Sequence, residues 1–336
     1  MTKSKILLKE ILDEFSQILN RITEQIKNAN NIAVIGHVNP DGDCVGSQLG
    51  LVLALNKIGK NAIPINEGKF KGIYKEYYEK HFEKDITNEY DLYIILDVPN
   101  KDRAGGFSNK IDFQKTIVID HHITNDNFGK INWVSDKFIA TAEMVFILLI
   151  SMDFDFKECE VSQYLLNALL SDNGFFQHIR NDKYLSLLVS YLMIENGADS
   201  KISYDLMFSN NSIETEKLFA LALQRLSSIY DGNVMWTYLT EEDKKKFDYP
   251  NFESGLVFRE MMSIRGVKVS VFFKIDEEQN KIDISFRSTD DVDVSQVAAS
   301  FGGGGHKVAA GVSVNGEFLD IKKQVFEKLE KILQKT

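Results

Sequence analysis

Three continuous apolar segments that end in acidic residues or glycine constrain the fold more than any other feature of this sequence. They are Asn31–Gly36, Leu92–Asp97 and Thr116–Asp120. Each segment has the length of a strand and is apolar throughout, which is typical of a strand buried on both faces. Strand and helix patterns alternate along this part of the chain. The sequence therefore predicts an α/β fold, in which a parallel sheet has helices on both faces.

Helical patterns precede and follow these strands. Apolar residues recur at helical spacing between Ile11 and Ile26, which predicts an amphipathic helix before the first strand. We then expect a helix at 45–58, a strand at 62–66 and a helix at 70–79. Tryptophans at two positions fall in predicted strands and are interpreted as core residues: Trp133 and Trp236. Further helices are expected at residues 140–152, 158–171, 182–196 and 200–207.

The pattern changes after residue 211. Ser212 is a candidate N-terminal cap of a helix that reaches about Tyr230, which we interpret as a connector between domains. Beyond it, alternating residues predict strands at 233–240, 267–275 and 281–288, then short and terminal helices at 294–301 and 318–333. We therefore expect three parts: a catalytic domain at 1–208, a connector helix at 209–230 and a smaller α+β substrate-binding domain at 231–336.

Composition excludes several classes of function. The 336 residues are 44% hydrophobic and 26% charged, as in ordinary globular proteins, and the net charge is −10. An acidic chain argues against a broad surface for long nucleic acid, which needs a basic stripe. The longest apolar run, at 144–150, is too short to span a membrane. Two cysteines are too few for a disulfide framework, so a cytoplasmic location is expected.

Acids and histidines gather where the predicted strands end. One loop after the first strand carries three of them, and the second and third strands are followed directly by others. Because carboxyl ends of parallel strands meet at one edge of a sheet, these side chains are expected to converge there. A further aspartate at the end of a predicted helix can complete the cluster. The candidate metal ligands are His37, Asp41, Asp43, Asp97, His121 and Asp172.

Carboxylates mixed with imidazoles suit Mn²⁺ and related divalent ions better than calcium or a structural zinc. One loop with three ligands can reach two ions, and Asp97 is the best-placed residue to bridge them. Four aspartates roughly balance the charge of two divalent cations. Water near such a pair is acidified and can attack phosphorus, so the pattern indicates a two-metal phosphoesterase centre.

Other interpretations of the first acidic loop are weaker. A calcium-binding loop that starts at Asp41 needs a glutamate at its twelfth position, where this chain has Val52. A dinucleotide-binding turn is disfavoured because acids at a strand-to-helix junction repel a pyrophosphate. A single aspartate at such a place is most simply a turn or helix cap. The two-metal interpretation depends on all the segments together.

A glycine-rich segment, Gly302–Gly311, points to an anionic substrate. Four consecutive glycines have a large entropic cost, and their use is to let the backbone approach a ligand closely and present N–H groups to it. His306, expected at the start of a helical turn, adds a donor. Arg287, at the end of a predicted hairpin strand, adds a fixed positive charge.

These motifs resemble the DHH phosphoesterase superfamily, specifically members with the DHH-associated C-terminal domain. The resemblance rests on three motifs: His37-x-x-Pro-Asp-Gly-Asp43, Asp120-His-His122 and the glycine-rich segment with His306. The resemblance spans His37 to Gly311. It includes the bacterial nano-RNase, 3′-phosphoadenosine-5′-phosphate phosphatase and cyclic-dinucleotide phosphodiesterase types.

The resemblance implies roles for individual residues. It implies that Asp97 bridges two ions, usually Mn²⁺, and that His122 contacts the scissile phosphate. Asp97 and His122 are therefore the expected catalytic residues. A second group binds another phosphate or the ribose of the nucleotide, across a cleft from the metals. This group consists of Arg287, Gly303, Gly304, Gly305 and His306. Two positions depart from the family: Cys44 stands where a small residue is common, and Asn173 where threonine is usual.

The sequence thus predicts a metal-dependent phosphodiesterase that converts short RNA or linear or cyclic dinucleotides to mononucleotides. Activity on 3′-phosphoadenosine 5′-phosphate and a homodimeric state remain open. The preferred substrate, the direction of cleavage and the native metal also stay open. Three alternatives are a single-strand exonuclease, a manganese pyrophosphatase and a non-catalytic nucleotide sensor. The acidic charge disfavours the first, the glycine-rich segment the second, and the complete ligand set the third.

Overall fold

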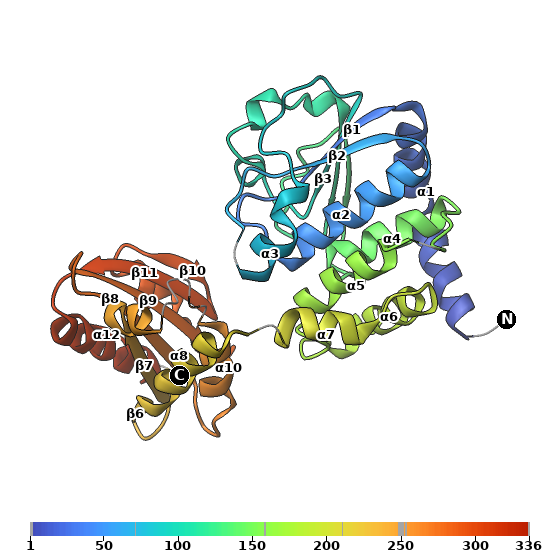
Figure 1. The fold of residues 1–336 in the computed structure, drawn as a ribbon. Helices are drawn as coiled ribbons and strands as arrows, with labels where there is room; N and C mark the ends of the chain where they lie inside the picture. The colour runs from blue at the N-terminus through green and yellow to red at the C-terminus, as the bar shows by residue number, and fades with distance from the viewer. Residues whose placement is uncertain are drawn as a thin grey trace. The chain divides into compact units, whose positions relative to one another are not determined.

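The computed structural model describes residues 3–70, 72–157, 159–209, 211–247, 252 and 254–334. It divides into two compact units, Met1–Asn210 and Asn211–Thr336, which are described separately (Figure 1). The start predicted for one helix, Glu158, lies outside the described residues.

The first unit is built on a parallel sheet of five strands within the described residues, in the order β2-β1-β3-β4-β5. The order reverses between β1 and β3, because the chain moves outward from β1 to β2 and then returns past β1. Ligand sites of such sheets lie at the carboxyl ends of the strands at this switch point. The strands are β1 Asn31–Ile35, β2 Asn61–Ile65, β3 Leu92–Leu96, β4 Thr116–Asp120 and β5 Ile131–Val134.

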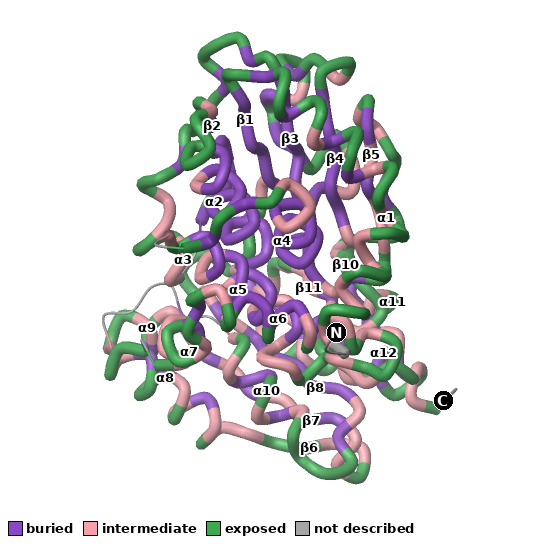
Figure 2. The backbone as a smooth tube through the Cα atoms, turned by 90° about the vertical axis from the view of Figure 1, so that its right-hand side faces the viewer, coloured by how far each residue is buried: buried purple, intermediate pink, exposed green. Residues whose placement is uncertain are grey.

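Long α-helices cover one face of this sheet. Ile32 and Val34 of β1 point to that face and share a buried core with Ile22 of α1 and Leu55 of α2. Figure 2 shows the buried strands and the helices beside them. The α-helices of the unit are α1 Lys3–Asn28, α2 Gly42–Lys57, α3 Gly72–Tyr77, α4 Thr141–Ser151, α5 Val161–Asp172, α6 Leu185–Glu195 and α7 Ser200–Phe208.

The second face is covered by the connections from β2 to β3 and from β3 to β4. Ala33, Ile35 and Ile95 point to this face and pack against Ala104 and Phe107 of the connections. Right-handed crossovers place returning connections on the face opposite α2. The predicted parallel sheet with helices on both faces is confirmed, but the second-face helices are short 3-10 helices. These lie at Lys101–Ala104, Ser108–Lys110 and Phe113–Lys115, with others at Glu79–His81 and Asn181–Lys183.

The second unit holds a mixed sheet in the order β10-β11-β9-β8-β7-β6. Helix α12 packs on one face through Val325 and Leu329, and α8 and α10 pack on the other through Leu218 and Val257. This is the α+β architecture predicted. The strands are β6 Ser227–Ile229, β7 Val234–Thr240, β8 Val269–Asp276, β9 Lys281–Ser288, β10 Gly304–His306 and β11 Ala309–Asn315. The helices are α8 Ile213–Gln224, α9 Glu241–Lys246, α10 Gly255–Ser263, α11 Ser295–Ala299 and α12 Phe318–Leu333.

Two local predictions in this part of the chain are wrong. The helix expected to continue to about Tyr230 ends at Gln224, and β6 follows it. Its apolar residues Leu218 and Ala222 are buried in the core of the second unit, so α8 is part of that unit's packing. His306 lies in strand β10, not at the start of a helical turn. Ser212 does cap α8, since its hydroxyl accepts from the Thr215 amide at 3.1 Å.

Within the described residues, no helix combines the length and apolar character needed to cross a bilayer.

Helices α2 and α5 pack closely at a glycine, and this contact matters for the site because α2 begins beside Asp41 and α5 ends at Asp172. A Cβ atom at Gly46 would lie 2.6 Å from the Tyr164 carbonyl oxygen and 2.7 Å from the Ala168 Cβ. Both neighbours are rigid, so a side chain at this position must push the two helices apart.

We predict that Gly46→Ala destabilises the first unit by about 1–3 kcal/mol, the usual cost of overpacking. Calorimetric unfolding should show a lower Tm for this unit. The control is Gly255→Ala, because a Cβ at Gly255 meets nothing within 4 Å. Equal effects of the two substitutions on the unfolding of their units would contradict the proposed helix contact.

Candidate metal centre

The loop after β1 places three of the predicted ligands at the N-terminus of α2. Asp41 is the N-terminal cap of this helix, and its carboxylate accepts from the Cys44 amide at 3.1 Å. Asp43 lies in the first turn and is fully buried. Acidic groups are stabilised at a helix N-terminus by unpaired amides and by the helix dipole. The preference for acidic residues at a helix N-terminus therefore also gathers negative charge at this point.

A second helix N-terminus holds Asp43 in place. The Asp43 carboxylate accepts from the backbone amides of Thr141 at 2.6 Å and Ala142 at 3.0 Å, and from the Ser47 hydroxyl at 3.0 Å. Helix α4 has Ala140 at its N-cap position, which offers no side-chain oxygen. Asp43 supplies that cap from a distant part of the chain. Sequence reasoning missed Thr141 and Ala142, because backbone donors leave no motif.

Asp97 lies between two histidines. Its Oδ2 is 3.4 Å from the His37 Nε2, and its Oδ1 is 3.5 Å from the His121 Nε2. The residue directly follows β3, is buried, and has φ of 61°. This left-handed conformation is costly for a residue other than glycine and is often found at functional sites. The two oxygens of one carboxylate thus face two different groups of ligand atoms.

The remaining predicted ligands complete these two groups. On one side, the His37 Nε2 is 3.5 Å from the Asp41 Oδ2. On the other, the His121 Nε2 is 3.4 Å from the Asp172 Oδ2 and 4.0 Å from the Asp43 Oδ2. All six predicted ligands therefore converge in the first unit, in two sets joined by Asp97.

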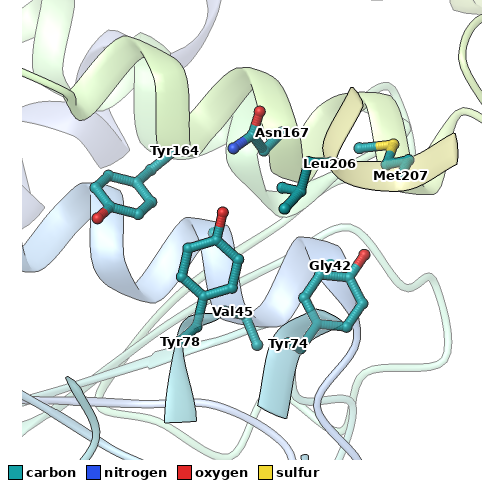
Figure 3. Close-up of a pocket in the computed structure, with 9 residues that line it drawn as sticks. Gly42, Val45, Tyr74, Tyr78, Tyr164, Asn167, Leu206 and Met207 are labelled. Carbon is teal, nitrogen blue, oxygen red and sulfur yellow. The ribbon is translucent and has the colours of Figure 1, made fainter. Parts of the chain in front are cut away.

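Close packing holds the α2 and α5 ends of the cluster together. A Cβ at Gly42 would lie 2.2 Å from the Ser171 Oγ and 2.5 Å from the Tyr74 hydroxyl oxygen. Only glycine fits between Asp41 and Asp43. Figure 3 shows Gly42 beside Tyr74, in a narrow pocket that Tyr78 and Tyr164 also line.

His122 lies beside this cluster, with its Nδ1 3.5 Å from the Asp97 Oδ1, and is oriented by Asp120. Its Nδ1 is 2.7 Å from the Asp120 Oδ1, and the other Asp120 oxygen accepts from the Asn125 side chain at 2.6 Å. Asp120 is completely buried, whereas 43% of the His122 side chain is exposed. The hydrogen bond to Asp120 raises the pKa of His122. Asp120 is thus a positioning residue, a role that the sequence prediction did not assign.

The cluster has an excess of negative charge. Burial, with the nearby Asp97 carboxylate, raises the pKa of Asp43, and burial raises the pKa of Asp172 to about 7. Burial opposes protonation of His121, but contact with Asp97 and the neighbouring carboxylates raises its pKa to about 10. For His37, burial is likewise outweighed by Cys44, Asp41 and Asp97, and its pKa rises. Both kinds of shift show that the site favours added positive charge.

The donor set fits divalent metal ions. Atoms of Asp43, His121 and Asp172 lie within 4.8 Å of one another, and so do atoms of Asp97, Asp120, His121 and His122. Carboxylate and imidazole donors suit borderline divalent cations. Such cations would neutralise the repulsion among the aspartates.

In the second unit, the sheet register aligns two predicted substrate-binding residues. Arg287 on β9 and His306 on β10 both pair with Ala309 on β11. Residues paired across adjacent strands project from the same face of the sheet, so both side chains lie on one face with a small residue between them. The Arg287 guanidinium lies 5.0 Å from the centre of the Phe258 ring of α10.

The glycines of this segment differ in whether packing requires a residue without a side chain. A Cβ at Gly303 would meet the Gly311 carbonyl oxygen at 2.4 Å, and one at Gly305 would meet that of Ala309 at 2.5 Å, where φ is also +144°. These two positions need glycine for the hairpin itself. A Cβ at Gly304 meets nothing within 4 Å, so packing among the described residues does not explain that glycine.

Comparison with known proteins places these features in one family. Residues 31–171 match the DHH family, N-terminal domain, and residues 231–335 match the DHHA1 domain. The chain belongs to the DHH family. The match confirms the family inferred from the motifs. Five of the six clustered residues lie within the DHH match and Asp172 directly follows it, whereas Arg287 and His306 lie within the DHHA1 match.

Relatives of this DHH protein cover nearly its whole length. The bifunctional oligoribonuclease and PAP phosphatase NrnA of Thermus thermophilus is 29% identical over 305 residues, which are 89% of this chain and 87% of that protein. The cyclic-di-AMP phosphodiesterase GdpP of Bacillus subtilis is 24% identical over 89% of this chain and 47% of its own length. The crystal structure of an exopolyphosphatase-related protein from Bacteroides fragilis has a TM-score of 0.81 and 26% identity, covering 94% and 96% of the two chains.

Two residues at which this DHH protein departs from the family pattern are buried at the centre. Cys44 is fully buried, its thiol lies 3.5 Å from the Gln48 Oε1, and it belongs to a group with His37 and Asp97. Burial raises its pKa to about 11, so it packs as a neutral thiol. Asn173 accepts from the Phe176 amide at 2.8 Å and fixes the turn after Asp172.

Arg103 is a further residue that sequence reasoning missed. Its Nη2 is 3.5 Å from the His37 Nδ1, and its carbonyl oxygen accepts from the Val38 amide at 2.9 Å. The only available signal was its position six residues after Asp97, on the connection that follows β3. The contact places a guanidinium beside the first loop of the DHH centre.

We predict that metal binding to the DHH centre releases protons and tightens as pH rises. In the metal-free cluster Asp172, with a pKa of about 7, and His121, with a pKa of about 10, hold protons that a metal ion must displace. The Kd for Mn²⁺ should fall about tenfold per pH unit between about pH 7 and 10, where His121 alone of the two holds a proton, and more steeply below pH 7, where Asp172 holds one as well.

Calorimetric titration in buffers of different ionisation enthalpy measures the number of protons released. Asp172→Asn should reduce that number. An affinity independent of pH would show that the cluster holds no exchangeable protons.

Proposed function

We propose that this DHH protein is a metal-dependent phosphodiesterase that hydrolyses short oligoribonucleotides or dinucleotides to mononucleotides. The position of Asp97 carries the proposal. One buried carboxylate directs its two oxygens to His37 and His121, and each histidine lies beside further aspartates. This is the arrangement expected for a carboxylate shared by two cations, and paired cations are suited to in-line displacement at phosphorus.

The ligand set is proposed to hold two divalent ions, with Mn²⁺ as the ion implied by the family resemblance. His37 and Asp41 would serve one position, and Asp43, His121 and Asp172 the other, with Asp97 shared. Bound there, such ions supply Lewis acidity and lower the pKa of water to give a nucleophile near neutral pH.

His122 is proposed to contact the scissile phosphate. Asp120 fixes its Nδ1 and favours the protonated ring, which leaves Nε2 as a donor. A charged donor stabilises the negative charge that develops on the phosphoryl oxygens. Because Asp120 is buried and held by Asn125, the ring is oriented before substrate binds.

The DHHA1 domain is proposed to bind the part of the nucleotide remote from the scissile bond. Arg287 and His306 project from one face of the sheet with Ala309 between them, which leaves room for an anionic group. Gly304 is exposed, and no described neighbour prevents a side chain there. Close approach of a ligand to this backbone is a physical reason for glycine at this position. Gly303 and Gly305 shape the hairpin that carries the segment.

The proposed substrate class is based on the names of two relatives, each of which matches 89% of this chain. The Thermus thermophilus relative carries the name of an oligoribonuclease and PAP phosphatase, and the Bacillus subtilis relative that of a cyclic-di-AMP phosphodiesterase. Both act on small phosphate esters of nucleotides. A net charge of −10 also disfavours long nucleic acid outside the site. Cytoplasmic location stays a prediction.

Turnover of a panel of substrates with Mn²⁺ tests the proposal. The panel contains a dinucleotide, RNAs of increasing length, a cyclic dinucleotide, 3′-phosphoadenosine 5′-phosphate and pyrophosphate. We expect mononucleotide products and rates that fall as RNA grows beyond a few nucleotides. Rates that stay level with length would favour a single-strand exonuclease. Hydrolysis of pyrophosphate alone would favour a pyrophosphatase, and binding without any turnover a nucleotide sensor.

We predict that Asp97→Ala lowers kcat/KM by about a thousandfold or more, equivalent to about 4 kcal/mol, because a shared ligand supports both cation positions. Metal content by mass spectrometry and rate should fall together, while circular dichroism stays unchanged. The matched control is Asp85→Ala, an exposed aspartate of the same domain that pairs with Lys110. Two ions bound with near-normal turnover would contradict the shared position.

We predict that Arg287→Ala and His306→Ala reduce kcat/KM for a dinucleotide by about 10- to 150-fold, the loss of a charged hydrogen bond of about 1.5–3 kcal/mol. Hydrolysis of a small chromogenic phosphodiester should change little, because remote binding energy is used only by the larger substrate. Lys307→Ala, next to His306 and exposed, is the control. Equal losses on both substrates would move these residues to the chemical step or to stability.

A further inference from the structure

Helix α6 of the first unit exposes a stripe of large apolar side chains. We call it the α6 stripe; it consists of Tyr184, Leu187, Tyr191 and Ile194, which are 57%, 52%, 49% and 45% exposed. The opposite side of the same helix is already buried, because three of its residues belong to the main core of the unit: Val189, Leu192 and Met193. The helix is therefore apolar on both sides. A surface helix of a monomer normally presents polar residues to water.

The stripe also lacks charge. Residues 184–194 read Tyr-Leu-Ser-Leu-Leu-Val-Ser-Tyr-Leu-Met-Ile and contain no Asp, Glu, Lys or Arg. Charged residues resume directly outside it, with Lys183 before and Glu195 after. A contiguous exposed apolar patch rimmed by polar residues is typical of an interaction surface, whereas single exposed apolar residues are ordinary.

The order of residues in the stripe is the same from either end. The four apolar positions are separated by three, four and three residues. When two copies of the helix pack antiparallel about a two-fold axis, Leu187 of one lies opposite Tyr191 of the other, and Tyr184 opposite Ile194. This spacing is that of a helix–helix seam, in which side chains of one helix fill the gaps of its partner.

Charge at the two ends selects the same alignment. In the antiparallel pair, Lys183 of each copy lies near Glu195 of the other. A parallel pair would place Lys183 against Lys183 and Glu195 against Glu195, which is unfavourable. The Tyr191 hydroxyl donates to the Glu195 Oε1 at 2.9 Å, so this carboxylate is already held beside the stripe.

We propose that the α6 stripe is the docking surface for a second copy of this chain, in an antiparallel two-fold contact. A two-fold interface requires one patch to be complementary to itself, and the symmetric spacing and opposite end charges meet that requirement. A membrane surface is the less favoured occupant, since a helix that lies on a membrane carries Lys or Arg on its polar face and α6 has none within 185–195.

Helix α6 also connects to the centre through buried contacts. The Ser186 hydroxyl donates to the buried Glu143 carboxylate of α4, whose other oxygen accepts from the Ile139 amide at 2.7 Å. The N-terminus of α4 is the element that holds Asp43. A partner on α6 would therefore rest against a helix joined directly to the support of the site, on the side away from α4.

The first test is the mass of the full-length protein in solution. Sedimentation or light scattering across a range of concentrations should give a dimer for the wild-type chain. Leu187→Glu places a charge opposite Tyr191 of the second copy and should give a monomer with an unchanged circular dichroism spectrum. The control is Leu319→Glu, at an apolar residue that is 69% exposed outside the stripe, and it should remain a dimer. A wild-type monomer at every concentration, or a dimer that persists in Leu187→Glu, would overturn the proposal.

Charge reversal tests the antiparallel alignment itself. Lys183→Glu and Glu195→Lys should each raise the dimer dissociation constant about tenfold or more, because each places like charges together. The double variant restores opposite charges across the axis and should recover dimerisation. Failure of recovery would exclude this alignment. Sedimentation of wild-type protein with phosphatidylcholine–phosphatidylglycerol vesicles, lost in Leu187→Glu, would instead identify a membrane surface as the occupant.

Discussion

The buried carboxylate of Asp97 lies between His37 and His121, and the rest of the centre depends on this position. Its oxygens are 3.4 and 3.5 Å from the two histidine nitrogens. The left-handed backbone at Asp97 turns the chain sharply where β3 ends. Strands β1 and β4 lie on either side of β3 in the sheet, so the residues that follow them meet on the two sides of Asp97. The order of strands, more than any loop, brings two groups of ligands to one carboxylate.

Four carboxylates this close together repel one another, and backbone amides oppose part of that repulsion. Behind the cluster, Asp43 receives two amides from the start of α4 and the Ser47 hydroxyl. Asp172 ends α5 with its side chain 28% exposed, and burial raises its pKa to about 7. Protein donors thus stabilise Asp43, and the proposed cations would stabilise the remaining carboxylates. The dimer surface proposed on α6 lies against the same supporting helix.

Much of the site could be predicted because it follows from local rules. Acids after apolar strands and before a helix indicate a strand-end site, and all six predicted ligands converge in the first unit. The groups that hold the site in place could not be identified from the sequence. They are the backbone amides of α4 that bind Asp43 and the hydrogen bond between Asp120 and His122. The predicted helix to Tyr230 failed for a similar reason: residues 227–229 form β6 and pair with β7, so the helix ends earlier, at Gln224. Helical periodicity alone does not show where tertiary pairing ends a helix.

The glycine-rich segment shows why a motif can be found correctly and its structure still be misjudged. Glycine is a poor strand former, and the sequence suggested a helical turn at His306, yet β10 forms because β11 lies beside it. Within that hairpin, Gly303 and Gly305 are required by contacts with the neighbouring strand, whereas Gly304 is not. A flexible phosphate loop would need all its glycines for the ligand. Here two of them build a rigid strand edge, and the register of that edge brings His306 into one row with Ala309 and Arg287.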